Sequence, residues 1–143
     1  MRFTEVSAEV LVTTEPITCV TREDIGLLKS KAAKNPPKRI PLCAHMNLDD
    51  SVHEMVIVHT KTNFNHPHKH PNKSESFHII EGELDIVIFD DAGQVLETIT
   101  LGEYSTDARF YWRLSESNYH MVIPRSDVVV FHEITSGPFN RAT

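Results

Sequence analysis

The chain has 143 residues, with 20 acidic and 14 basic side chains and a formal net charge of -6. It contains no block of like charge, which argues against a nucleic acid or an anionic membrane as partner and favours a small molecule. Since 40% of its residues are apolar, we expect one folded domain with a hydrophobic core over residues 1–143.

The N-terminal segment carries carboxylates where a secretory signal would need an uninterrupted apolar run. No later stretch approaches the length that spans a membrane, so a cytoplasmic location is the default expectation. Cys19 and Cys43 show no spacing typical of a disulfide framework or a zinc knuckle. Because disulfides are rare in the cytosol, we predict two free thiols.

The N-terminal part, residues 1–36, is predicted to hold a strand over residues 8–13 and a helix over residues 22–34. Thr21 is a candidate N-cap three residues before an acid, and Ile25, Leu28 and Ala32 then recur at helical spacing. The helix is expected to end before the proline-rich segment at residues 35–37.

The rest of the chain, residues 37–139, is predicted to be β-structure, because short apolar runs alternate with turn residues. Turn signals at residues 81–83 and 90–93 indicate antiparallel hairpins. About eight strands at this spacing are typical of a sandwich or a jelly-roll barrel. We therefore predict an all-β fold with one N-terminal helix. The predicted strands cover residues 39–46, 52–60, 77–80, 84–89, 94–101, 108–114, 119–123 and 128–134.

The strongest chemical signal is a group of histidines, three of which fall within residues 66–70. If His68 and His70 lie on one extended strand, their side chains project from the same face. A bend at residues 71–74 then returns Glu75 towards the same point. Two imidazoles and a carboxylate suit divalent iron, manganese, nickel or zinc, so the residues predict one such metal ion here.

The same segment resembles the first motif of the cupin superfamily, His-x-His followed by Glu and Gly, as His68, His70, Glu75 and Gly82. This resemblance implies a cupin jelly-roll barrel, the double-stranded β-helix, and a fourth metal ligand from a histidine on a later strand. Of the two late histidines, His120 is preferred over His132, since it follows a predicted turn. The chain departs from the motifs at Thr62, at residues 115–117 and at Pro124, where glycine, P-x-G and asparagine are usual.

Within the superfamily, residues 37–139 resemble the WbuC type of cupin-fold metalloprotein. The resemblance rests on segments that include Pro37-Lys38-Arg39, Pro67-His68-Lys69-His70-Pro71, Phe89-Asp90-Asp91-Ala92-Gly93 and Gly137-Pro138-Phe139. That group is associated with gene clusters for cell-surface polysaccharide, which implies carbohydrate or nucleotide-sugar chemistry. Dimerisation is common among cupins, so the resemblance also implies a homodimer.

These observations leave three functions open. The leading hypothesis is a metal ion that acts as a Lewis acid in isomerisation, epimerisation or hydrolysis of a small polar molecule. A non-haem iron dioxygenase and a non-catalytic sugar-binding or regulatory cupin are the alternatives. The sequence shows no clear acid-base pair, so whether the chain is an enzyme stays open.

Arg39 and His45 share strand parity on the predicted strand over residues 39–46. Both are therefore candidates for projecting into the barrel and contacting an anionic or hydroxylated substrate. His53, His59 and His132 are expected to be structural or surface residues.

Overall fold

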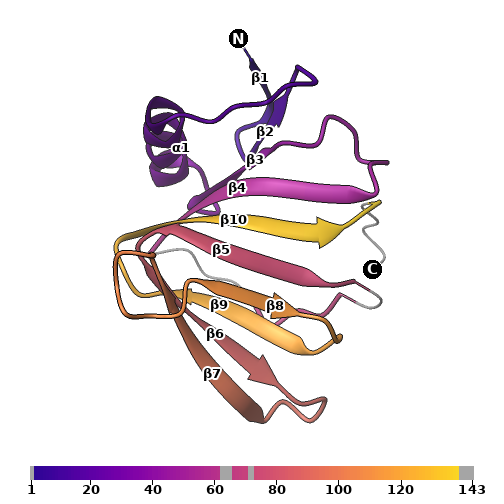
Figure 1. The fold of residues 1–143 in the computed structure, drawn as a ribbon, viewed down its shortest axis with the longest axis vertical. Helices are drawn as coiled ribbons and strands as arrows, with labels where there is room; N and C mark the ends of the chain where they lie inside the picture. Colours follow the sequence, from indigo (N-terminus) through magenta and orange to yellow (C-terminus); the bar gives the residue numbers. More distant parts are fainter. Residues whose placement is uncertain (1, 62–65, 71–72, 139–143) are drawn as a thin grey trace.

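The computed structural model describes residues 2–61, 66–70 and 73–138. Thr62, residues 71 and 72 of the predicted bend, and Phe139 lie outside this part of the chain. Within the described residues the fold is mostly β-sheet with one helix, α1 (Arg22–Lys34), as Figure 1 shows. The strands are β1 (Phe3–Ser7), β2 (Val10–Thr13), β3 (Arg39–Cys43), β4 (Val52–Thr60), β5 (Glu75–Glu81), β6 (Glu83–Phe89), β7 (Val95–Gly102), β8 (Tyr111–Leu114), β9 (Tyr119–Pro124) and β10 (Val128–Ser136).

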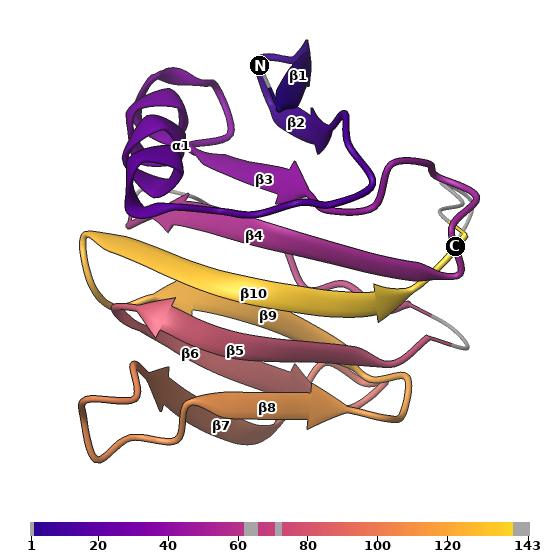
Figure 2. The same ribbon diagram turned by 45° about the horizontal axis from the view of Figure 1, so that its top comes forward.

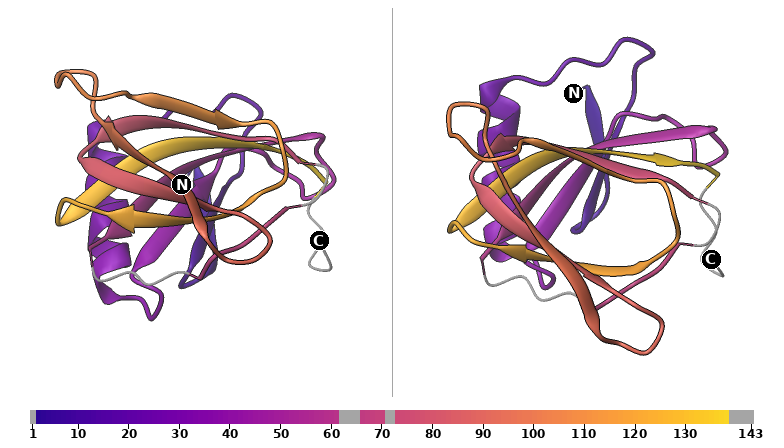
Figure 3. Two further views of the ribbon diagram at one scale, coloured as in Figure 1. Left: turned by 90° about the horizontal axis from the view of Figure 1, so that it is seen from below. Right: turned by 60° about the horizontal axis from the view of Figure 1, so that its bottom comes forward.

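The strands form two sheets that face each other (Figures 2 and 3). The larger sheet has the order β1-β2-β3-β4-β10-β5-β8, and the smaller sheet has the order β7-β6-β9. Neighbouring strands are antiparallel except β2 and β3. The predicted fold class, all-β with one N-terminal helix, is confirmed.

Residues 57–59 of β4 and 129–131 of β10 are buried on both faces, because the large sheet separates two hydrophobic cores. Successive side chains of a strand point to opposite faces. Ile57 and Phe131 accordingly lie in the core between the sheets, whereas Val58 and Val130 pack beneath α1. The first core contains Ile57, Phe77, Ile79, Leu84, Ile86, Ile88, Leu101, Trp112, Val122, Val129 and Phe131, and the second contains Phe3, Leu11, Leu28, Ala32, Ile40, Leu42, Val58 and Val130.

Helix α1 has the bounds that the sequence predicts. The Thr21 hydroxyl accepts a hydrogen bond from the Asp24 amide at 3.2 Å, and the Asp24 carboxylate accepts one from the Thr21 amide at 2.8 Å. This reciprocal pair is a capping box, which satisfies amides that the first helical turn leaves unbonded. The helix is too short and too polar to cross a lipid bilayer, and no other helix occurs in the described residues.

Strand β3 is shorter than predicted, since it ends at Cys43 and not at residue 46. The Ala44 amide still donates to the Glu54 carbonyl at 2.8 Å. Beyond it, Nδ1 of the His45 ring lies 3.2 Å from both the amide nitrogen and the carbonyl oxygen of Glu54. A side chain, and not the backbone, thus contacts Glu54 at this point.

Candidate metal centre

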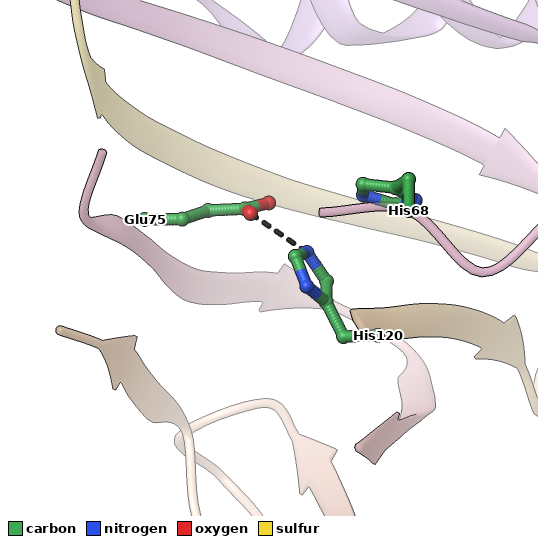
Figure 4. A group of neighbouring side chains, drawn as sticks. All are labelled: His68, Glu75 and His120. Atoms are coloured by element: carbon green, nitrogen blue, oxygen red, sulfur yellow. Dashed lines mark hydrogen bonds and ion pairs between the residues drawn. The ribbon is translucent and has the colours of Figure 1, made fainter. Parts of the chain in front are cut away.

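Three predicted metal ligands, His68, Glu75 and His120, lie close together with their side chains turned toward one another (Figure 4). Glu75 opens β5, and His120 lies in β9. His68 is not on a strand but forms a single bridge with His120, in which each amide donates to the other residue's carbonyl at 2.9 Å. The candidate ligand atoms of the three side chains all lie within 4.8 Å of one another.

Backbone contacts orient both imidazoles of this cluster. Nδ1 of His120 lies 2.9 Å from the Asn118 carbonyl, and Nδ1 of His68 lies 3.1 Å from the His66 carbonyl. Because a carbonyl oxygen only accepts, each Nδ1 carries a proton and donates it. Nε2 is therefore the ring nitrogen that each histidine offers to the centre, an arrangement common among metal-binding histidines.

Glu75 and His120 form an ion pair in the structure. Their side chains are buried, with 7% and 1% of each residue exposed, and Nε2 of His120 lies 2.8 Å from Oε2 of Glu75. Burial alone raises the pKa of Glu75, but the hydrogen bond and charge of His120 outweigh it, so that pKa falls below its ordinary value. Burial likewise lowers the pKa of His120, and the Glu75 carboxylate reverses this and raises it.

The third group, His68, is set up as a neutral ligand. Burial, followed by the nearby His120, lowers the pKa of its ring. A neutral imidazole and a carboxylate are the protonation states that metal coordination requires. The donor types of the cluster, two imidazoles and a carboxylate, fit a divalent transition metal, and His120 would release its Nε2 proton on binding the ion.

His70, the fourth residue of the predicted set, lies beside the cluster and not within it. Its ring centroid is 5.1 Å from that of His68 and 6.2 Å from that of His120. The single bridge at His68 explains the difference, because the common face expected for the two histidines required a longer strand. Pro67 lacks an amide proton and limits strand pairing at this point.

His132 lies away from the cluster. It pairs with the carboxylate of Glu54, with Nε2 3.2 Å from Oε1. On β10 it has opposite parity to Phe131, whose side chain is in the core between the sheets. Of the two late histidines, His120 is the one that the fold brings to His68 and Glu75.

The cluster borders a cavity of about 260 Å³ between the sheets. Its walls are mainly apolar, and the large sheet contributes most of them. Arg39 lines this cavity, whereas His45 does not: its ring is buried and stacks on that of His53, with centroids 4.0 Å apart. The expectation that His45 faces the same way as Arg39 does not apply, because β3 ends at Cys43. The cavity is lined by Glu9, Val10, Pro37, Arg39, Pro41, Met55, Ile57, His59, His68, Glu75, Phe77, Val122, Phe131 and Glu133.

Sequence reasoning missed Glu133 and assigned His59 a structural or surface role, and the structure places both residues at the cavity. Burial, the charge of Glu75 and a hydrogen bond between the two side chains raise the pKa of Glu133 well above its ordinary value. The raised pKa favours the protonated form of Glu133, and in this form Glu133 donates to the Glu75 carboxylate. The signal available in the sequence was parity, since an acid stands two residues after the inward-facing Phe131 on a predicted strand.

The sequence matches, over residues 20–101, a family described as Domain of unknown function (DUF6016). This match covers more than half of the chain. The chain belongs to this family. No curated protein matches the sequence of this DUF6016 member.

Solved structures with a similar fold are cupin-domain proteins. KdgF from Halomonas sp. aligns with 76% of this DUF6016 chain and 86% of its own, at 10% identity and a TM-score of 0.56. The Cnp3 cupin domain of Schizosaccharomyces pombe aligns with 69% of this chain and 64% of its own, at 11% identity and a TM-score of 0.51. Oxalate decarboxylase of Bacillus subtilis, a protein with Mn(II) centres, aligns with 67% of this chain and 24% of its own, at 18% identity and a TM-score of 0.52.

These comparisons confirm the predicted cupin jelly roll. The DUF6016 chain spans about a quarter of the oxalate decarboxylase and 64% of the Cnp3 cupin chain. At such identities the likeness concerns the fold, so reaction and substrate follow from the site itself.

Proposed function

We propose that this chain is a metal-dependent cupin of the WbuC type that acts on a small polar molecule related to carbohydrates. His68, Glu75 and His120 hold one divalent ion of iron, manganese, nickel or zinc, and His70, whose ring lies beside that of His68, is the fourth ligand. The observation that carries the proposal is the cluster of three ligand atoms within 4.8 Å at the wall of a cavity.

The metal ion and the residues around it have different roles at this site. A bound divalent ion supplies Lewis acidity to a substrate oxygen, which suits isomerisation or epimerisation of a sugar. Glu133 holds Glu75 by a hydrogen bond, and the carbonyls of His66 and Asn118 hold the two imidazoles. Apolar side chains such as Phe77 and Phe131 line the cavity.

The resemblance to the WbuC type supports a cellular setting as part of the same proposal. We infer a role linked to surface-polysaccharide biosynthesis, carried out in the cytoplasm by a homodimer. The net charge of -6 supports a small molecule over a nucleic acid as the partner.

Elemental analysis of the purified protein tests the metal site. We expect about one transition-metal ion per chain in the wild type and at least a tenfold loss in His68→Ala and Glu75→Gln. His78→Ala is the matched control, because His78 is an exposed imidazole on β5 outside the cluster. No stoichiometric ion in the wild type, or full metal content in both ligand variants, would refute the proposal.

Turnover assays distinguish the proposed enzyme from the two alternatives. Sugars and sugar derivatives are first screened for an increase in the melting temperature of the metal-loaded protein. Each hit is then incubated with the protein, and its conversion and the consumption of O₂ are followed. Isomerised or epimerised product supports the proposal, O₂ consumption with iron supports a dioxygenase, and tight binding without conversion supports a sugar-binding module.

A further inference from the structure

The cavity wall on the large sheet is a regular grid of side chains that starts from Arg39. Arg39 pairs with His59, and Pro41 pairs with Ile57, between β3 and β4. Ile57 in turn pairs with Phe131 of β10. Because residues two apart on a strand share a face, all five side chains border the same cavity.

Arg39 and the metal cluster occupy different ends of this grid. Glu133 lies two residues beyond Phe131, and β10 pairs it with Phe77 of β5, two residues after Glu75. An apolar stretch formed by Ile57, Phe131 and Phe77 therefore separates Arg39 from the cluster. A molecule that contacts both ends lies with one face on apolar side chains.

Arg39 is the only lysine or arginine among the described residues that line this cavity. In that part of the chain no ion pair joins its guanidinium to a carboxylate. Two acids on the same wall are engaged, since Glu75 pairs with His120 and Glu133 is hydrogen-bonded to Glu75. Glu9 and Arg39 are both exposed, and no ion pair joins them.

The charge of Arg39 reaches into the cavity from its end of the grid. Together with burial, which is the larger cause, it lowers the pKa of His59. It also acts to lower the pKa of Glu133, although burial and Glu75 raise that pKa by more. A guanidinium remains protonated at every physiological pH, and its planar fork of donors matches an oxyanion. The cavity thus offers a permanent cation at one end and the metal ligands at the other.

We propose that Arg39 binds an oxyanion of the substrate, a carboxylate or a phosphate, while a second oxygen of the same molecule reaches the metal centre. This inference rests on the proposed function and narrows it to acidic or phosphorylated small molecules. The cavity of about 260 Å³ lies just below the usual range for ligand pockets, roughly 300–1,000 Å³. That size suits a single sugar ring with its anionic group.

Calorimetric titration of the metal-loaded protein with three probes tests this inference. Glucuronate carries a carboxylate, glucose 6-phosphate carries a phosphate, and glucose is their neutral counterpart. We expect at least one anion to bind roughly tenfold or more tightly than glucose, as a charge-assisted contact implies. The preferred anion then identifies which of the two groups the site accepts.

Variants of Arg39 assign the preference to this residue. Arg39→Gln should abolish the preference for the anion, and Arg39→Lys, which keeps the charge but not the fork, should retain part of it. Arg22→Gln is the matched control, since Arg22 is exposed on α1 and does not line the cavity. Equal binding of the three probes by the wild type, binding of none of them, or a full preference in Arg39→Gln overturns the inference.

Metal content measured on the same samples separates the two proposals. Arg39→Gln should keep the ion, because Arg39 is outside the ligand cluster. A wild-type protein without a stoichiometric ion refutes the proposed function itself. A metal-loaded wild type that binds glucose as well as it binds the anions refutes only the role of Arg39.

Discussion

Glu133 supports the metal centre through Glu75, whose carboxylate also meets His120. Replacing a residue that holds a metal ligand typically costs 10–100-fold in metal affinity. We expect a loss in this range for Glu133→Ala, and a smaller one for Glu133→Gln, whose amide still donates a hydrogen bond to Glu75. Competition with a metallochromic chelator measures both. Equal affinities in Glu133→Ala and the wild type would contradict this role.

His59 should make the fold less stable in acid. Burial, and then the charge of Arg39, lower the pKa of this ring from 6.5 to about 3, and only 4% of the residue is exposed. Between these two values the unfolded chain binds a proton that the folded chain does not. The stability that neutral His59 contributes is therefore complete above pH 6.5 and is lost as the pH falls towards 3, at no more than about 1.4 kcal/mol per pH unit.

Urea unfolding at pH 7.5 and at pH 5 measures this dependence. His59→Gln should lose less stability on acidification than the wild type does. His78→Gln, which changes an exposed ring, should follow the wild type. If the wild type and His59→Gln lose the same free energy of unfolding between pH 7.5 and pH 5, His59 does not cause the loss of stability in acid.

The two cysteines should differ sharply in reactivity, since Cys43 is buried and Cys19 is exposed. Burial is the main cause that raises the pKa of the Cys43 thiol to about 11. At pH 8 roughly one Cys43 thiol in a thousand is then the reactive thiolate. We expect Ellman's reagent to modify one thiol rapidly and the second only in denaturant. Rapid modification of native Cys19→Ser protein would contradict the burial of Cys43.

At the scale of the elements, Gly82 fixes the turn between β5 and β6. Its φ is +87°, and a Cβ there would lie 2.6 Å from the Val128 carbonyl oxygen. Gly93 has nearly the same φ, +86°, but a Cβ at this position meets no atom within 4 Å. The pair therefore separates the cost of crowding from the cost of backbone strain.

We expect Gly93→Ala to cost about 1 kcal/mol in the free energy of unfolding, the usual cost of left-handed backbone strain. Gly82→Ala should cost at least about 3 kcal/mol, because the backbone must also move to admit the methyl group. Chemical denaturation of the two variants gives both values. Equal losses would show that Gly82 is needed only for its φ.

Elements with local signals were predictable from the sequence. Helix α1 has the predicted bounds, because its capping box and apolar spacing lie within the helix and its first neighbours. Strand β3 ended early, and beyond it the ring of His45 contacts the backbone of Glu54, a residue of the next strand. The segment at His68 pairs with β9 by a single bridge, which residues 66–70 alone do not reveal.

At the scale of the whole molecule, the order of the strands decides which residues meet. The motif predicted His68 and Glu75 as neighbours, and the superfamily resemblance added His120. Glu133 was missed because β10 inserts between β4 and β5, and hairpin reasoning pairs only strands that follow each other in sequence. The same insertion brings Arg39 and the metal ligands to one cavity. Strand parity within β3 predicted that Arg39 projects into the barrel, but it did not predict that Arg39 shares a cavity with these ligands.

Anomalous diffraction from crystals of the purified protein tests whether one metal ion lies among His68, His70, Glu75 and His120. Data collected on both sides of the metal's absorption edge locate the ion. We expect one strong anomalous peak at about 2.0–2.2 Å from imidazole nitrogens and the Glu75 carboxylate. A peak at other residues, or none in crystals grown with the metal, would contradict it.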